Sequence, residues 1–389
     1  MDREDVAVHS ARVDRVRVEA APGIGAASFV SGRPLTLSPF SIPLTENDPL
    51  ALYPLLLEPV YKEKVWGGRS LERFGRSLPG GPDARIGESW ELADLPTTSP
   101  SGGGGEGAHT RIRNGPLSER AIDDVLRDFR EHVLGSAAER SGQAFPLLLK
   151  YLDASENLSV QVHPSAEYAA AHPGAHLKSE AWYIVDAEPG AKIYRGVREG
   201  TTPASLREAI ETGTVDDLLV QVPAEIGACH YLPSGTCHAL GAGIFVAEIQ
   251  TPSDTTFRVY DWDRTDRELH VEQALECIDF GPVDTGRYEP GTVVEDGHAR
   301  GRHLVDCEHF AVWEWTLSQA DTRRFTSDEL SVLMLVRGRG LLAWGSETAQ
   351  TLPIGAGDTT LLPAALPSVE LRADEELVLL EVTLPKSAT

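Results

Sequence analysis

The sequence predicts a mainly β protein of two β-sandwich (jelly-roll) barrels, with a helical segment inserted around the first. Short apolar runs punctuated by Gly and Pro follow one another between residues 147 and 263, a pattern that is typical of sandwiches and barrels. A comparable series of runs returns after about residue 280. The chain has 389 residues, which is long enough for two or three domains, so two barrels fit its length.

The N-terminal part of the chain contains little regular pattern. Residues 1–50 are rich in Ala, Pro and Ser without sustained periodicity, and we expect them to form a poorly ordered extension. Regular pattern begins near Tyr53. The Gly-rich stretch from Ser101 to Gly107 predicts a flexible loop, because it lacks the strand and helix pattern that surrounds a phosphate-binding loop.

Three segments predict helices. A helical segment is expected over 117–140, with Ser118 as its N-cap and with one apolar face formed by Ala121, Val125, Phe129 and Val133. A second helix is expected to start after Thr202, and a third within residues 268–280.

The predicted strands fall into two series. Those of the first barrel lie within residues 147–154, 158–164, 180–187, 191–196, 228–235, 244–251 and 257–263. Those of the second lie within 309–317, 330–345 and 355–384. The two series share a spacing, since the interval from Gly357 to Pro363 equals that from Gly227 to Pro233. His238 in the first series corresponds to Ser368 in the second, so we expect only the first barrel to bind a metal.

Composition limits the class of protein and its partners. Hydrophobic residues make up 41%, and no run of about 18 apolar residues is present to form a transmembrane helix. Charged residues near the start argue against a signal peptide, so we expect a cytoplasmic protein with its four cysteines as free thiols. The net charge of −24 argues against nucleic acid and anionic membranes as partners. A phosphorylated small molecule stays compatible, because a local group of cations acts over only about 10 Å.

Four residues, Gln161, His163, Glu180 and His238, predict a metal site by their types and spacing. Gln161 and His163 point to the same face of a strand, and so do Lys178 and Glu180, because side chains alternate along a strand. His238 follows a strand and a tight turn. Two imidazoles, a carboxylate and an amide oxygen without a thiolate indicate zinc, iron or manganese.

These residues also carry a resemblance to a known family. The interval from Gly227 to His238 reads G-x5-P-x-G-x2-H and resembles the second signature of the cupin superfamily, while Gln161, His163 and Glu180 fit its first signature. Glutamine in place of the usual first histidine, with Lys178 two residues before the glutamate, resembles type I phosphomannose isomerases in their shorter bacterial form. Three further segments match that family: Glu63–Gly68, Ile86–Trp90 and Gln250–Asp261.

The resemblance implies a fold, an activity and a set of site residues. It implies cupin-type barrels, with a catalytic metal-binding domain over 51–280 and a cupin-like domain without metal ligands over 281–389. The implied activity is zinc-dependent interconversion of mannose 6-phosphate and fructose 6-phosphate through an enediol(ate), with one zinc ion per chain. The implied metal ligands are Gln161, His163, Glu180 and His238. The implied catalytic residues are Arg258, Lys178 and Asp254, and Lys178 and Trp66 are candidate substrate-binding residues.

The chemistry of these residue types suits that reaction. A zinc ion polarises a carbonyl, and a permanently cationic arginine stabilises a developing enediolate without losing its proton. Thr256, Arg258 and Tyr260 are expected on one inward face of their strand. The general base stays open among Asp254, Lys178 and a water molecule on the metal.

Two other functions also fit the residues. Two histidines and a carboxylate also bind iron in oxygenases, and a sugar-binding relative without turnover is a third possibility. The oligomeric state stays open.

Overall fold

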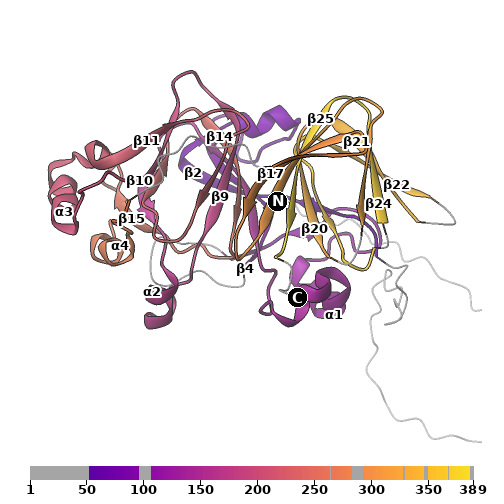
Figure 1. Cartoon of the computed structure of the whole chain (residues 1–389), viewed down its shortest axis with the longest axis horizontal. Coiled ribbons are helices and arrows are strands. Elements are labelled where there is room, and N and C mark those ends of the chain that lie inside the picture. Colours follow the sequence, from indigo (N-terminus) through magenta and orange to yellow (C-terminus); the bar gives the residue numbers. More distant parts are fainter. Residues whose placement is uncertain are drawn as a thin grey trace, which may run out of the picture. The chain divides into compact units, whose positions relative to one another are not determined.

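The computed structural model describes residues 52–95, 107–262, 264–282, 292–326, 329–345, 349–366 and 368–385. The predicted extension over 1–50 lies outside these residues, as does the Gly-rich loop except for Gly107. The chain is mainly β, as predicted, with antiparallel strands in two sandwiches (Figure 1). Among the described residues, no helix is long and apolar enough to cross a membrane.

The first sandwich packs a six-stranded sheet against a five-stranded sheet. The six-stranded sheet has the order β12 (Cys229–Leu232), β9 (Glu180–Ala187), β14 (Ile244–Gln250), β7 (Leu148–Ala154), β3 (Ile86–Leu92) and β2 (Val60–Gly68). The five-stranded sheet has the order β11 (Leu219–Pro223), β10 (Lys192–Val197), β13 (His238–Leu240), β8 (Val160–Val162) and β15 (Phe257–Tyr260). Buried apolar side chains from both sheets form one cluster between them, including Leu152, Trp182, Ile193 and Leu240.

The second sandwich repeats this strand order. Its larger sheet runs β16 (Val293–Asp296), β17 (Ala299–Asp306), β18 (Ala311–Leu317), β25 (Leu377–Thr383), β20 (Ser331–Arg337), β23 (Thr359–Leu362), β1 (Leu55–Glu58) and β6 (Arg111–Ile112). Its smaller sheet runs β19 (Thr322–Thr326), β24 (Ser368–Ala373), β21 (Arg339–Trp344) and β22 (Gln350–Gly355). The larger sheets of the two sandwiches have equivalent strand orders. The order β12, β9, β14, β7, β3, β2 in the first corresponds to the order β23, β20, β25, β18, β17, β16 in the second. The repeat that the glycine and proline spacing predicts is therefore a repeat of topology.

Two short strands from the N-terminal side extend the second sandwich. Strand β1 pairs with β23, with Leu55 opposite Leu361, and β6 pairs with β1. A separate two-stranded sheet joins β4 (Asp94–Leu95) to β5 (Ala108–His109). Residues of the predicted 51–280 segment thus belong to a sheet of the second sandwich.

Helix α1 begins later than the sequence predicts. It spans Ile122–Leu134 and continues as a 3-10 helix over Gly135–Glu139. Ala121, not Ser118, is its N-cap, because Glu119 adopts a left-handed backbone with φ of 69° that breaks any earlier turn. Val125 and Val133 are buried as predicted, but Phe129 has non-helical backbone angles that kink the helix.

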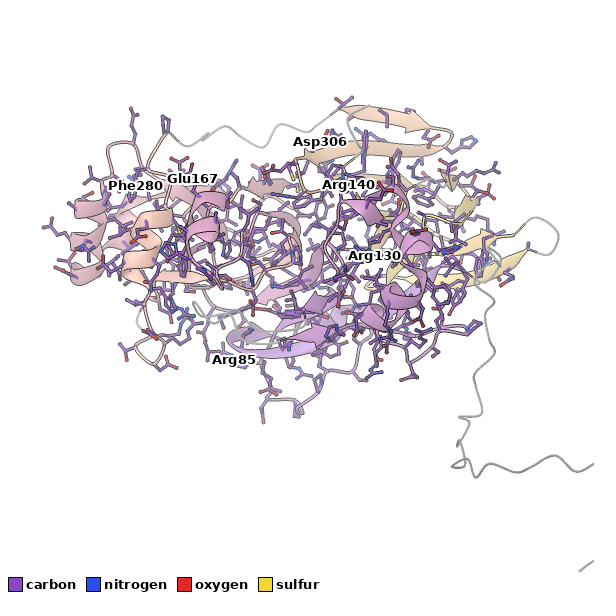
Figure 2. The ribbon with its side chains drawn as sticks, turned by 90° about the horizontal axis from the view of Figure 1, so that it is seen from below. Arg85, Arg130, Arg140, Glu167, Phe280 and Asp306 are labelled. Carbon is purple, nitrogen blue, oxygen red and sulfur yellow. The ribbon has the colours of Figure 1, made fainter. Side chains whose placement is uncertain are left out.

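The remaining helices differ in how well the sequence predicts them. Helix α3 (Pro203–Thr212) starts after Thr202 as predicted, with Thr202 and Ser205 forming a capping box. Helix α4 spans only Val271–Cys277 of its predicted segment. Helix α2 (Ala166–Ala171) was not predicted, because it buries no side chain and so has no apolar stripe; its Glu167 projects from the surface (Figure 2). Short 3-10 helices lie at Ser70–Phe74 and Val215–Leu218.

Helices α3 and α4 cover the outer face of the five-stranded sheet and thereby fix which side chains point inward. Leu206 of α3 and Ala274 of α4 belong to one buried cluster with outward-facing apolar residues of β8 and β15, among them Val160, Val162, Phe257 and Val259. The alternating residues Gln161 and Arg258 therefore face the interior of the sandwich.

The expectation for Tyr260 was wrong. The pairing of β15 with β8 shifts between Arg258 and Tyr260, which is a β-bulge, and Tyr260 packs with the outer cluster. Thr256 and Arg258 remain on the inward side, where both line a pocket.

Candidate active site

Three of the four predicted metal ligands meet inside the first sandwich. One donor atom from each of His163, Glu180 and His238 lies within 4.8 Å of the others, and all three side chains are buried. Glu180 Oε1 is 3.2 Å from His238 Nε2, and Glu180 Oε2 is 3.5 Å from His163 Nε2. The amide of Gln161 lies 3.3 Å from His238 Nε2. A half-turn of this amide directs its oxygen toward the same point.

The two sheets bring these residues together from opposite sides. Strands β12 and β13 do not pair with each other: β12 pairs with β9, where Leu232 lies opposite Glu180, and β13 pairs with β8, where His238 lies opposite Gln161. The turn between β12 and β13 therefore carries the chain from one sheet to the other. It places the carboxylate of one sheet against the imidazole and amide of the other.

Both imidazoles are oriented for ligation. The Nδ1 atom of His163 donates to the Thr255 carbonyl at 3.0 Å, and Nδ1 of His238 donates to the Thr236 carbonyl at 2.8 Å. These hydrogen bonds leave each Nε2 with its lone pair facing Glu180. Burial and the nearby Lys178 cation lower the pKa of His163 to about 3, which keeps this ring neutral.

Glu180 supplies the negative charge of the group. Burial alone would raise the pKa of Glu180, but the Lys178 cation holds it well below its usual range. Both carboxylate oxygens are buried and accept no hydrogen bond of good geometry among the described residues. Two imidazoles, an ionised carboxylate and an amide around one point fit a divalent cation such as zinc.

Lys178 lies directly against the ligands. Its Nζ is 2.6 Å from Glu180 Oε2 and 3.1 Å from His163 Nε2, and the side chain also lines the neighbouring pocket. The sequence argument directed this ammonium toward substrate and the carboxylate toward metal. In the structure the ammonium contacts the carboxylate as well as the pocket.

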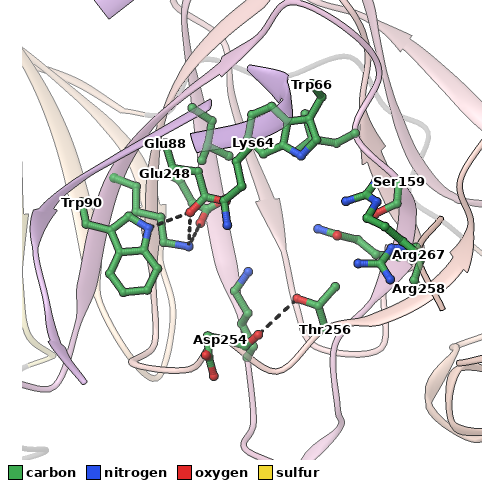
Figure 3. Close-up of a pocket in the computed structure, with 15 residues that line it drawn as sticks. Lys64, Trp66, Glu88, Trp90, Ser159, Glu248, Asp254, Thr256, Arg258 and Arg267 are labelled. Carbon is green, nitrogen blue, oxygen red and sulfur yellow. Dashed lines mark hydrogen bonds and ion pairs between the residues drawn. The ribbon is translucent and has the colours of Figure 1, made fainter. Parts of the chain in front are cut away.

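A pocket of about 180 Å³ opens beside the ligands (Figure 3). It receives residues from both sheets and from the loop before β15, and all the predicted non-histidine site residues except Glu180 line it: Trp66, Gln161, Lys178, Asp254 and Arg258. Arg258 donates from NH1 to the Glu268 carbonyl at 2.6 Å. Trp66 also packs into the apolar core of the sandwich, so it serves both as core residue and as pocket wall.

Five charged residues of the pocket were not assigned a role from the sequence: Lys64, Glu88, Lys150, Glu248 and Arg267. Lys64 Nζ lies 3.3 Å from Glu88 Oε1, Lys150 Nζ lies 3.8 Å from Glu88 Oε2, and Lys150 Nζ lies 3.2 Å from Glu248 Oε1 (Figure 3). Trp90 donates from Nε1 to Glu88 at 2.6 Å. The result is a row of alternating charges along one wall.

The pKa values follow from this arrangement. Burial opposes the charge on Glu88, but Lys64 and Lys150 lower its pKa to about 2. Burial likewise opposes the charge on Lys150, but Glu248 and Glu88 raise its pKa above the usual value. Both groups are therefore ionised at neutral pH.

For Lys150 and Glu248, the sequence contains a signal that could have identified them as pocket residues. Lys150 and Glu248 are charges inside the apolar strands β7 and β14, where every residue is buried, and they pair directly across those strands. A charge in such a run is costly unless it is paired or functional. Glu88 and Lys64 lie within segments that match the family, but nothing in their spacing marks them as neighbours.

Comparisons with known proteins agree with this site. Residues 55–192 match the family model "Phosphomannose isomerase type I, catalytic domain". Mannose-6-phosphate isomerase ManA of Bacillus subtilis (strain 168) is 34% identical over 331 residues, covering 84% of this chain and 98% of that protein. The chain belongs to the type I phosphomannose isomerase family. The predicted resemblance is thus confirmed.

Other relatives support the same assignment. Mannose-6-phosphate isomerase of Streptococcus mutans is 34% identical, covering 84% of this chain and 97% of that protein. The crystal structure of mannose 6-phosphate isomerase from Bacillus subtilis has a TM-score of 0.73 at 32% identity and covers 85% of this chain and 99% of that one. A putative mannosephosphate isomerase from Archaeoglobus fulgidus, at 20% identity and a TM-score of 0.64, shares the fold.

Proposed function

We propose that the protein is a zinc-dependent mannose-6-phosphate isomerase that interconverts mannose 6-phosphate and fructose 6-phosphate through an enediolate. Relatives that bear this name match the chain over most of their length. The observation that carries the proposal is the meeting of His163, Glu180 and His238 beside a pocket lined by several cations and carboxylates. An aldose–ketose isomerase needs such a combination, because it must polarise a carbonyl and move a proton between adjacent carbons.

One zinc ion per chain would be held by Gln161, His163, Glu180 and His238. When bound, it supplies Lewis-acid polarisation of the sugar carbonyl. The donor set supports zinc over magnesium or calcium, because two of its four members are imidazole nitrogens.

The surrounding residues divide the remaining work. Arg258 stabilises the negative charge that develops on the enediolate oxygens, and it cannot act as a base because its guanidinium stays protonated. Asp254 and Lys178 line the same pocket and are the proposed proton-transfer residues. Trp66 forms a wall of the pocket against which the sugar carbons pack.

Family membership favours this reaction over the iron oxygenase. The pocket supports the same choice, because oxygen chemistry has no use for the row of lysines and carboxylates on its wall. These charged groups also favour turnover over sugar binding alone, since burying them is costly without a chemical role.

A coupled assay tests the proposal. Purified protein should convert mannose 6-phosphate to fructose 6-phosphate, lose that activity on dialysis against a chelator, and regain it when zinc is added. Activity that survives complete removal of metal would contradict the zinc dependence. A folded, zinc-loaded protein without turnover would contradict the isomerase assignment.

A further inference from the structure

Three guanidinium groups surround a single buried carboxylate at one end of the pocket. Asp261 is 2% exposed and accepts hydrogen bonds from Arg267 Nε at 2.7 Å and from Arg264 NH2 at 2.9 Å. Arg264 also reaches Glu156 at 3.5 Å and the Asn157 carbonyl at 2.7 Å. Arg258 is the third guanidinium, and its own anchor is a backbone carbonyl, that of Glu268. Asp261 therefore shares its negative charge between Arg264 and Arg267.

Two of the three arginines face the pocket with unused donors. Arg258 and Arg267 both line it, together with Ser159, and they lie on the side opposite the row formed by Lys64, Glu88 and Glu248 (Figure 3). Among the described residues, Arg267 NH1 has no hydrogen-bond partner, and Arg258 Nε is buried without one.

Arg258 is buried and Arg267 is partly buried, and among the described residues each keeps an N–H group without a protein partner. Burial lowers the pKa of Arg258, the neighbouring Arg267 lowers it further, and Asp261 opposes both effects. An anion beside Arg267 NH1 would satisfy that free N–H group and relieve the repulsion between the two guanidiniums. The phosphate of a sugar phosphate has this chemistry, and arginine forks suit phosphate oxygens.

The segment that carries Asp261 is held in a fixed conformation. Trp262 adopts a left-handed backbone with φ of 58°, which is unfavourable for a bulky side chain. Its indole Nε1 donates to the Leu158 carbonyl at 2.7 Å, directly before the pocket residue Ser159. The ring also packs against Tyr194 and Tyr260. This anchoring sets the position from which Asp261 reaches Arg267.

We propose that Asp261 is a positioning residue that holds Arg267 at the mouth of the pocket, so that the Arg267 guanidinium binds the phosphate of the substrate. The proposal rests on the proposed function, since it names the end of the site that takes the 6-phosphate. Asp261 itself does not touch substrate. It occupies Nε and NH2 of Arg267 and leaves NH1 for a phosphate oxygen.

The direction in which Asp261→Asn changes phosphate affinity distinguishes a positioning role from simple charge balance. If Asp261 only neutralised the cluster, Asp261→Asn would make the pocket more positive and bind phosphate more tightly. If Asp261 positions Arg267, the same substitution releases the guanidinium and weakens binding. We expect Asp261→Asn to raise the KM for mannose 6-phosphate about tenfold or more while kcat stays within a few-fold, as expected for a contact made equally in ground and transition states.

The experiment uses the zinc-loaded full chain and two readouts. The first is the KM and kcat for mannose 6-phosphate; the second is the Kd of inorganic phosphate by calorimetry, which does not require turnover. Glu272→Gln is the matched control, because Glu272 pairs with Arg207 in an exposed ion pair on the outer helices. This control should leave both readouts unchanged.

A double-mutant cycle keeps the test decisive. Arg267→Met should raise the KM and the phosphate Kd as Asp261→Asn does, and adding Asp261→Asn to Arg267→Met should then have little further effect. Asp261→Glu should recover part of the binding.

If Asp261→Asn fails to fold, the Arg267→Met and Asp261→Glu variants are compared with the wild-type protein instead. Unchanged or tighter phosphate binding in Asp261→Asn, or in Arg267→Met when Asp261→Asn does not fold, overturns the proposal. A wild-type protein that binds phosphate without isomerising would refute the proposed function and leave this inference standing.

Discussion

Arg258 is the single residue whose removal should separate chemistry from folding. Its guanidinium lies in the pocket, is fixed by one hydrogen bond to the Glu268 carbonyl, and forms no direct ion pair among the described residues. A charge held in this way is free to stabilise a developing enediolate. We expect Arg258→Ala to keep its zinc and its melting temperature within a few degrees. Turnover should fall by about 10²–10⁴, in line with the loss of one well-placed oxyanion donor or somewhat more.

The measurement needs bound zinc, melting temperature and turnover on one preparation. KM should change much less than kcat, because the neutral carbonyl of the substrate gains little from the cation. Arg207→Ala is the matched control, since Arg207 forms its ion pair with Glu272 in an exposed position on the outer helices. Near-normal turnover in a folded, zinc-loaded Arg258→Ala protein would rule out its catalytic role.

The sequence predicts the group of candidate ligands that the structure brings together, but it does not predict the charged row on the pocket wall. Gln161, His163 and Glu180 lie close together along the chain, and a strand's alternation places the first two on one face. The row of Lys64, Glu88, Lys150 and Glu248 comes from four strands that meet only after the sheet forms. No local spacing encodes such contacts.

At the scale of elements, the beginning of strand β9 holds the site's most delicate contact. Lys178 Nζ lies 2.6 Å from the carboxylate of Glu180, so the two side chains form a close ion pair at the candidate metal site. We propose that Glu180 binds metal and Lys178 serves the substrate. Glu180→Gln should therefore lose zinc, because a neutral amide replaces the one anionic donor. Lys178→Ala should keep zinc and lose turnover.

Metal content by elemental analysis decides between these roles. Lys178→Ala also removes a cation from beside the ligands, so its zinc affinity should be equal to or greater than that of the unmodified protein. Loss of zinc from Lys178→Ala would show that the lysine supports the metal site itself, and the division of roles would be wrong.

Elements were predictable where local signals determine them. The capping residue Thr202 and the glycine at 213 fix helix α3, and its predicted start is confirmed. The start of α1 was wrong because Glu119 takes a left-handed turn that composition does not reveal. The prediction placed Tyr260 on the wrong face because the bulge in β15 arises from the pairing of β15 with β8. Pairing partners are tertiary information, and strand alternation fails where they impose an extra residue.

At the scale of the whole molecule, the two sandwiches share topology but differ inside. The registers place Thr326 where the first sandwich has Gln161, and Ser331 where it has Glu180. The counterpart of His163, Asp328 in the sequence, lies outside the described residues. On this basis we propose that 51–280 is the catalytic segment and 281–389 a cupin-like domain without a metal site.

In the second sandwich, the buried carboxylate of Glu381 pairs with an arginine. Arg323 pairs with Glu381 at 2.9 Å and lies 3.3 Å from the ring centre of Trp315, which also donates to Glu381 at 2.7 Å. By register, Glu381 takes the place of the pocket residue Glu248. Glu248 pairs with Lys150 beside the open pocket of the first sandwich, whereas Glu381 pairs with Arg323 beside the Trp315 ring in the second. The second sandwich thus has a structural ion pair at the position where the first sandwich has its candidate active site.

This difference predicts how many metal ions the protein holds. Elemental analysis of metal-replete protein should find one zinc per chain, bound in the first sandwich. His238→Ala should remove that zinc and the activity together, because it deletes one of the two nitrogen donors of the site. Ser368→Ala, at the corresponding position of the second sandwich, is the matched control and should change neither zinc content nor turnover. Two zinc ions per chain, or zinc that stays bound in His238→Ala, would contradict a single site built on these ligands. Zinc lost from Ser368→Ala would instead show that the second sandwich takes part in binding the metal.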